Sequence, residues 1–186
     1  LSNDENSGRF ACPLNSGETC ITSPKLVEHE NGAFLTSSIS VPLLIEGEPI
    51  GFLGIDLRLD MLIDIVSRSD QSLFGGVGRV HMISLDGTLL ASDENPSAVG
   101  SPFSSEHISA DKITDFLFGG EIQTEWTENG DWLTVFAPLT MANRTWGVIF
   151  EMPRSAVVAD AESLDQIISA QVNAGIKTQL LVGVLF

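Results

Sequence analysis

The segment FLTSSISVPLLIEGEPIGFLGIDLRLDMLIDIV, residues 34–66, decides the fold of this chain. Two apolar runs flank the turn sequence EGEP, a pattern typical of an antiparallel hairpin. If Gly47-Glu48 forms the tip, Ile39 lies opposite Asp56, and Asp56 shares a face with Phe52. Both faces of the predicted hairpin are largely apolar, so we expect each of them to be covered.

Asp56 lies at the end of an otherwise apolar strand that runs into a predicted amphipathic helix, residues 58–67. A carboxylate there is costly unless a cation or a hydrogen-bond donor meets it. Three roles stay open: contact with a ligand, capping of the helix, or an ion pair with Arg58 or another base. Ser38 is a second candidate ligand-binding residue, since it alternates with apolar residues along its strand; exposure to solvent is the other interpretation.

Composition excludes some classes of function. Among 186 residues, 25 are acidic and 9 are basic, which gives a formal net charge of -16. Such a surface repels phosphate, so we exclude nucleic acid as a partner. No Gly-x-Ser-x-Gly motif, phosphate loop or pair of motif-placed acids is present, so we predict neither enzymatic activity nor a cofactor.

The cysteines and histidines suggest a disulfide rather than a metal site. Cys12 and Cys20 flank the polar loop PLNSGET, and a disulfide closing this loop fits a protein outside the cytoplasm; two free thiols remain the alternative. His29, His81 and His107 show no metal-ligand spacing with the cysteines or with one another, so we predict no metal site.

The rest of the chain predicts a second group of strands. A hairpin is expected around the turn Asp86-Gly87, followed by a short helix that ends at Gly119-Gly120. The expected elements are strands at 79–85 and 88–92, a helix at 111–118, and strands at 121–127, 131–139 and 144–152. This order is typical of an α+β fold with antiparallel sheets, not of a parallel βαβ fold.

Residues 153–186 read as one long helix whose last seven residues are apolar or Gly. The apolar end fits the first turns of a transmembrane helix, or alternatively an ordinary C-terminal helix. Apolar residues at near-heptad spacing also suit pairing with a partner helix. These residues are Val157, Ala161, Leu164, Ile168 and Val172.

Two segments resemble a known family. Residues 40–66 resemble the end of the membrane-distal module of a double Cache domain, and residues 82–100 resemble the start of its membrane-proximal module. The family's G-x-x-G-x-D motif stands here as Gly51 to Asp56, and its paired-strand motif stands as Ile83 to Ser92. Double Cache domains are the extracytoplasmic sensors of bacterial methyl-accepting chemotaxis receptors, and of some membrane histidine kinases and diguanylate cyclases.

The resemblance implies an α+β fold of PAS-like antiparallel sheets with flanking helices and a long C-terminal helix. It implies a partial membrane-distal module at 1–73 and a membrane-proximal module at 74–152. Residues 153–186 would then form a signalling helix that leads into a truncated transmembrane segment.

The resemblance also implies a function. In amino-acid-sensing members, the Asp that Asp56 matches receives the ligand's α-ammonium, and an upstream Arg with aromatic neighbours binds the carboxylate. We therefore expect a homodimeric sensor on the periplasmic or extracellular side of the bacterial inner membrane, with an amino acid, another amine or a small carboxylate as ligand. A protein-interaction module with a vestigial pocket is the alternative without a ligand. The chain has no tyrosine, and Lys25 stands where the family has an aromatic residue.

Overall fold

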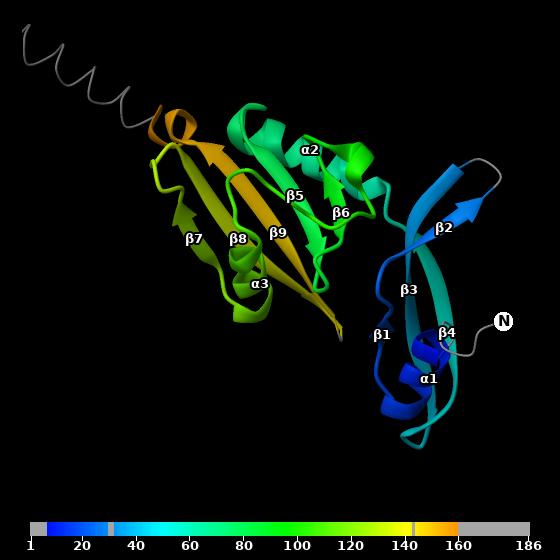
Figure 1. Cartoon of the computed structure of the whole chain (residues 1–186). Helices are drawn as coiled ribbons and strands as arrows, with labels where there is room; N and C mark the ends of the chain where they lie inside the picture. Colours follow the sequence, from blue (N-terminus) through cyan, green and yellow to red (C-terminus); the bar gives the residue numbers. More distant parts are fainter. Residues whose placement is uncertain (1–6, 30–31, 143, 160–186) are drawn as a thin grey trace, which may run out of the picture.

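The chain forms two antiparallel sheets with helices packed on them, which confirms the predicted α+β class (Figure 1). The computed structural model describes residues 7–29, 32–142 and 144–159. The elements are α1 (Ser7–Ser16), β1 (Cys20–Ile21), β2 (Lys25–His29), β3 (Gly32–Ile45), β4 (Glu48–Arg58), α2 (Met61–Phe74), β5 (Arg79–Ser84), β6 (Leu89–Ser92), the 3-10 helix η1 (Pro96–Ala98), α3 (Ala110–Gly119), β7 (Gln123–Trp126), β8 (Trp132–Met141) and β9 (Arg144–Pro153).

The first sheet is built on the long β3–β4 hairpin, but in a register that differs from the predicted one. Asp56 lies opposite Ser38, not opposite Ile39. The tip of the hairpin is Glu46-Gly47, both with positive φ (51° and 88°), which is the geometry of a tight two-residue turn. Moving the tip by one residue toward the N-terminus changes every cross-strand pair.

A β-bulge contributes to the final register. The ladder shifts between Leu43 and Leu44, because Leu43 pairs with Gly51 while Leu44 pairs with Pro49. One extra residue on β4 therefore moves all later pairs by one position. The apolar pattern of the two strands holds no signal for this bulge, so the sequence-based register was wrong.

Helix α1 covers only one of the two faces of this hairpin. Phe10 of α1 packs on Phe52 of β4, with 5.2 Å between ring centroids. On the opposite face, the side chains of Leu53 and Ile55 are 65% and 53% exposed. The expectation that both faces are covered is therefore wrong for the described residues.

Helix α2 begins later and ends later than the predicted helix at 58–67. Strand β4 continues through Arg58, because residues 56–58 still pair with β3. Asp60 is the N-cap residue of α2, and Gly75 ends the helix in the left-handed conformation with φ 63°. Apolar spacing identified the helix but did not locate its ends.

The second sheet has the strand order β6-β5-β9-β8-β7. The hairpin at Asp86-Gly87, the helix before Gly120 and the three following strands are all confirmed to within a few residues. Residues alternate between the two faces of β5, as a strand requires. Val80 and Met82 face one core, whereas Ile83 faces the other.

These two cores lie on opposite sides of the second sheet. One core joins both parts of the chain, because it contains Leu35 of β3 and Leu59 after β4 together with residues of β5, β6 and β9. Helix α2 contributes Val66 to this core. The other core lies under α3 and consists of Ile83, Leu89, Ile108, Ile113, Phe116, Leu117, Phe136 and Ile149.

The predicted C-terminal helix lies mostly outside the described residues. Residues 154–159 are helical, whereas 160–186, which include most of the near-heptad positions and the apolar end, are not described. Among the described residues, no helix is long and apolar enough to cross a membrane.

Cys12 and Cys20 form a disulfide, which is one of the two alternatives that the sequence allows. Their Cα atoms lie 6.1 Å apart, and the bond ties α1 to β1. Because α1 covers the face of the hairpin that carries Asp56, the disulfide helps to hold that cover in place.

We expect the unreduced protein to resist thiol alkylation and to take up two alkyl groups after reduction and unfolding. Replacing both Cys12 and Cys20 with Ser should lower the free energy of unfolding by about 2–3 kcal/mol, because the unfolded chain gains loop entropy. Mass spectrometry and denaturant titration measure the two effects. Full alkylation of the native, unreduced protein would contradict the disulfide.

Asp70 of α2 is a buried carboxyl with an unusual environment. Burial raises its pKa above the ordinary value of 3.8, the charge of Asp93 raises it further, and a backbone hydrogen bond from Gly78 opposes both effects. Its Oδ1 atom has no hydrogen-bond partner among the described residues. The folded state therefore favours the protonated carboxyl, so this group stabilises the fold at acidic pH and loses that contribution as the pH rises.

We predict that Asp70→Asn stabilises the protein at pH 7 by about 1 kcal/mol, the order expected when a poorly satisfied buried charge is removed. The gain should vanish below about pH 3, where the wild-type carboxyl is neutral in both the folded and the unfolded state. Denaturant titrations across this pH range measure the difference. Asp64→Asn, on the exposed side of the same helix, is the matched control, and an equal effect of both variants would contradict the prediction.

Candidate functional site

The first candidate site lies on the covered face of the β3–β4 hairpin and consists of Arg9, Ser38, Ser40 and Asp56, here called the Asp56 cluster. The Ser38 hydroxyl donates a hydrogen bond of 2.5 Å to Asp56 Oδ1. Arg9 Nη2 of α1 lies 3.2 Å from the same oxygen. The structure thus brings together both residues that the sequence proposed, Asp56 and Ser38, and adds a guanidinium.

This geometry decides two of the three roles left open for Asp56, and it also decides whether Ser38 faces solvent. Asp56 does not cap a helix, because β4 continues past it and the N-cap residue of α2 is Asp60. The expected ion pair exists, but its cation is Arg9; Arg58 instead pairs with Asp60 at 2.5 Å. Ser38 is buried, so the interpretation that it faces solvent is wrong.

Two buried polar atoms in the cluster have no hydrogen-bond partner among the described residues: Arg9 Nε and Ser40 Oγ. Both lie beside Gly54, where an added Cβ atom would come within 3.4 Å of Ser40 Oγ and 3.7 Å of Arg9 Nε. Buried polar groups in proteins are nearly always satisfied, by protein or by a bound molecule. The cluster therefore offers a free N–H donor and a free hydroxyl next to a carboxylate that is 51% exposed.

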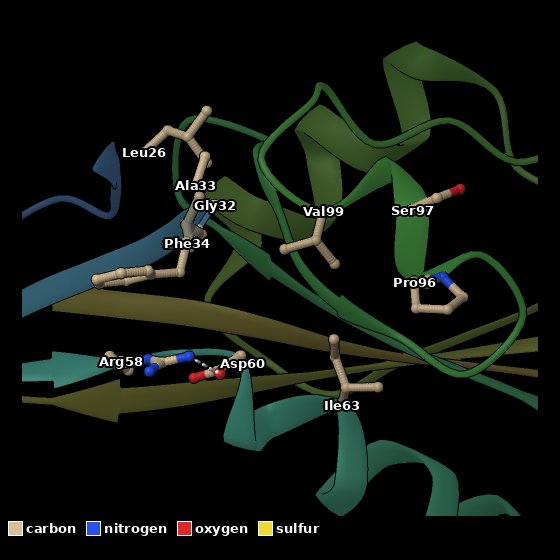
Figure 2. A pocket seen from close by; sticks show the side chains of 11 residues that line it. Leu26, Gly32, Ala33, Phe34, Arg58, Asp60, Ile63, Pro96, Ser97 and Val99 are labelled. Atoms are coloured by element: carbon tan, nitrogen blue, oxygen red, sulfur yellow. Dashed lines mark hydrogen bonds and ion pairs between the residues drawn. The ribbon is translucent and has the colours of Figure 1, made fainter. Parts of the chain in front are cut away.

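A cavity of about 460 Å³ lies between the first sheet and the segments of α2 and η1, as Figure 2 shows. Phe34 and Arg58 lie at one side of it, with the Arg58 guanidinium 4.4 Å from the centre of the Phe34 ring. Ile63 of α2 and Val99 lie at the other side. Neither Asp56 nor Ser38 lines this cavity, so it is separate from the Asp56 cluster.

A third group of polar side chains lies on the second sheet, at one end of the face that α3 covers. Glu151 of β9 is fully buried, and it accepts a hydrogen bond from the Ser105 hydroxyl. His81 Nε2 of β5 lies 3.3 Å from Glu151 Oε2. Burial alone would raise the pKa of Glu151, but the hydrogen bonds from His81 and Ser105, together with the charges of His81 and His107, outweigh burial and lower it.

Arg79 lies beside this buried group and contacts two acidic side chains and one aromatic ring. Its Nε lies 3.1 Å from Glu94, and its Nη1 lies 3.2 Å from Glu106. The guanidinium also lies 4.7 Å from the centre of the Trp132 ring. An open hollow of about 400 Å³ leads in from this surface and is lined by Arg79, His81 and Glu94, among other residues.

Sequence reasoning missed several of these residues. Arg9 lies 47 residues before Asp56 along the chain, and the sequence gave no reason to pair them. Glu151 carried the same signal as Asp56, because it is a lone acid in the apolar run WGVIFEM. The sequence therefore carries a signal for Glu151 as a buried acid that needs a partner.

No family model matches the chain. A curated relative, the methyl-accepting chemotaxis protein TlpQ of Pseudomonas aeruginosa strain PAO1, is 28% identical over 160 residues, which is 84% of this chain and 22% of TlpQ. The chain therefore spans about a fifth of that receptor.

Solved structures agree with this relative. The structure titled methyl-accepting chemotaxis protein X is 26% identical, with a TM-score of 0.62 over 83% of this chain and 57% of that one. Two further structures share the fold. The ligand-binding domain of the Pseudomonas aeruginosa PAO1 amino acid chemoreceptor PctC in complex with GABA has a TM-score of 0.55 and 15% identity. The match covers 82% of this chain and 65% of that one. The extracellular domain of the histidine kinase mmHK1S-Z2 has a TM-score of 0.60 and 20% identity. This match covers 85% of this chain and 59% of that one.

These similarities extend over more than four fifths of the chain, so they include residues of both sheets. The PctC structure is a chemoreceptor ligand-binding domain, and the antiparallel α+β architecture of this chain is the one that the Cache resemblance implies. The chain is thus similar in sequence to a methyl-accepting chemotaxis protein, and it has the α+β fold of chemoreceptor ligand-binding domains.

Proposed function

We propose that this chain is the extracytoplasmic ligand-sensing part of a transmembrane chemotaxis receptor, and that it binds its ligand at Asp56 and Ser38. The observation that supports this most directly is the Asp56 cluster itself. A half-exposed carboxylate, fixed by a buried serine hydroxyl, lies under a small helix in a fold shared with chemoreceptor ligand-binding domains.

The ligand that fits this site carries a cationic nitrogen. Arg9 already places a guanidinium nitrogen at 3.2 Å from Asp56, so a ligand ammonium can occupy an equivalent position if Arg9 turns away. The attraction between such a charge and Asp56 is stronger in a partly buried site than in water. An amino acid would also use Arg9 Nε, which has no hydrogen-bond partner within the described part of the chain, to bind its carboxylate.

The proposal extends to the organisation of the receptor. Residues 1–73 would form part of a membrane-distal module, residues 74–152 a membrane-proximal module, and residues 153–186 a signalling helix that leads into the membrane. We propose a homodimer, with this part on the periplasmic side of the bacterial inner membrane. Ligand binding would then shift the equilibrium between two states of the receptor, by an amount limited to its differential affinity for them.

A second candidate is the sensor of a membrane histidine kinase, since an extracellular domain of such a kinase shares the fold at a TM-score of 0.60. Both functions use the chain as a binding module and assign it no catalytic step. The output domain distinguishes them, and the same sensor fold serves either one.

We predict that Asp56→Asn abolishes ligand binding in a thermal-shift screen of amino acids, amines and small carboxylates. A ligand that binds only the folded state raises the melting temperature of the wild-type protein. The unliganded variant should melt close to the wild type, because a half-exposed ion pair contributes about 1 kcal/mol or less. Asp60→Asn, which breaks the neighbouring pair with Arg58, is the matched control and should keep the response.

Ligand binding retained by Asp56→Asn would remove Asp56 from the site. A screen with no hit in the wild-type protein would instead favour an interaction module.

Arg9 gives a second test of the ligand class. If Arg9 competes for Asp56, then Arg9→Gln should strengthen binding of amines that lack a carboxylate, because their competitor is gone. The same variant should weaken binding of amino acids, because the partner of the ligand carboxylate is lost. Isothermal titration calorimetry with one ligand of each class measures both effects, and a change of the same sign for both would contradict this role of Arg9.

A further inference from the structure

The second sheet carries a group of three metal-binding side chains that the proposed function does not use. His81, Glu94 and Glu151 each offer a ligand atom, and these atoms all lie within 4.8 Å of one another. His81 and Glu151 are buried, whereas Glu94 lies at the surface. In the sequence, the three residues are far apart with no recognisable spacing, which explains why no metal site was predicted.

The two buried members are held in position by hydroxyl groups. His81 Nδ1 lies 3.0 Å from Ser92 Oγ, which leaves Nε2 directed at Glu151. The Ser105 hydroxyl donates to Glu151 Oε1, which leaves Oε2 directed at His81. Outer partners of this kind orient the ligands in metal sites of proteins.

The spacing of the two facing ligand atoms also fits a metal ion. His81 Nε2 and Glu151 Oε2 are 3.3 Å apart, which is long for a charge-assisted hydrogen bond. A tetrahedral zinc ion, with bonds of about 2.0–2.1 Å, holds its ligand atoms about 3.3 Å from one another.

The local charge is compatible with a cation. Arg79, a fixed positive charge beside Glu94, is paired with both Glu94 and Glu106. Its contact with Glu94 involves one carboxylate oxygen, Oε1, and a carboxylate has two oxygens that can accept. The hollow of about 400 Å³ that His81 and Glu94 line gives a path from solvent to the site.

We propose that His81, Glu94 and Glu151 bind a divalent transition-metal ion, with Zn²⁺ as the representative species. One imidazole and two carboxylates suit Zn²⁺ better than Ca²⁺ or Mg²⁺, which prefer oxygen ligands alone. Three protein ligands leave a fourth position for water. This site lies on a different sheet from the Asp56 cluster and shares no residue with it.

The test uses the chain of 186 residues without an affinity tag, stripped of metal with EDTA and then freed of the chelator. Titration with ZnCl₂ should raise its melting temperature, whereas CaCl₂ and MgCl₂ should not. Co²⁺ should give the visible absorption of a tetrahedral site.

The decisive variant is Glu94→Gln, because Glu94 lies at the surface and its loss should not unfold the protein. We expect it to weaken Zn²⁺ binding by at least about tenfold, the loss expected when a metal site is disturbed. Glu106→Gln is the matched control, because it also removes an acidic partner of Arg79 but lies outside the set of three.

An absence of any Zn²⁺-dependent shift in the wild-type protein would overturn the proposal, and His81–Glu151 would then be a purely structural pair. Equal losses in Glu94→Gln and Glu106→Gln would overturn it too, because they would indicate a diffuse attraction to acidic groups instead of coordination.

Discussion

The packing of Leu35 and Leu59 against the second sheet is the constraint on which the arrangement of this molecule depends. Both residues belong to the first part of the chain, yet they are buried in a core with Val80 and Trp146 of the second sheet. Burying a large aliphatic side chain stabilises a fold by about 1.5–3 kcal/mol. Because Leu59 follows β4 directly, the strand that carries Asp56 is fixed to the second sheet by packing as well as by the chain itself. The hydrogen bond from Arg144 Nε to the Ile21 carbonyl, at 3.1 Å, is a second connection between the two parts.

Local signals in the sequence were sufficient for most of the fold. Alternating apolar residues and turn residues placed the strands of the second sheet, and the glycine pair Gly119-Gly120 marked the end of α3, because these features depend on a few neighbouring residues. The register of the first hairpin depends instead on backbone details of the turn and of the strand pairing. Glu46 adopts a positive φ and the ladder contains a bulge, and neither feature has a distinctive residue pattern. A single-residue error there exchanges Ile39 for Ser38 opposite Asp56, which changes the chemistry of the site.

The candidate sites show a similar division. That Asp56 needs a partner followed from the cost of burying a carboxylate, and this argument holds whatever the fold. Which group supplies the partner depends on tertiary structure, since Arg9 reaches Asp56 only because α1 folds back over the hairpin. The same argument applies to Glu151, whose partners His81 and Ser105 come from two other segments. Sequence reasoning can thus identify a buried charge that needs compensation, but long-range contacts decide whether the compensating group is a side chain, a ligand or a metal ion.

The shared core also limits how a signal can pass through this chain. A ligand at Asp56 can influence the second sheet only through elements that differ between two states. Strand β4 leads into α2, and α2 packs on the face of β5 that carries Val80. Successive residues of β5 face opposite sides, so a shift of Val80 under α2 necessarily moves Arg79 and His81 on the other face. A displacement of β5 would therefore change the positions of the polar residues around Glu151. By linkage, anything bound there would influence the Asp56 cluster with the same coupling free energy.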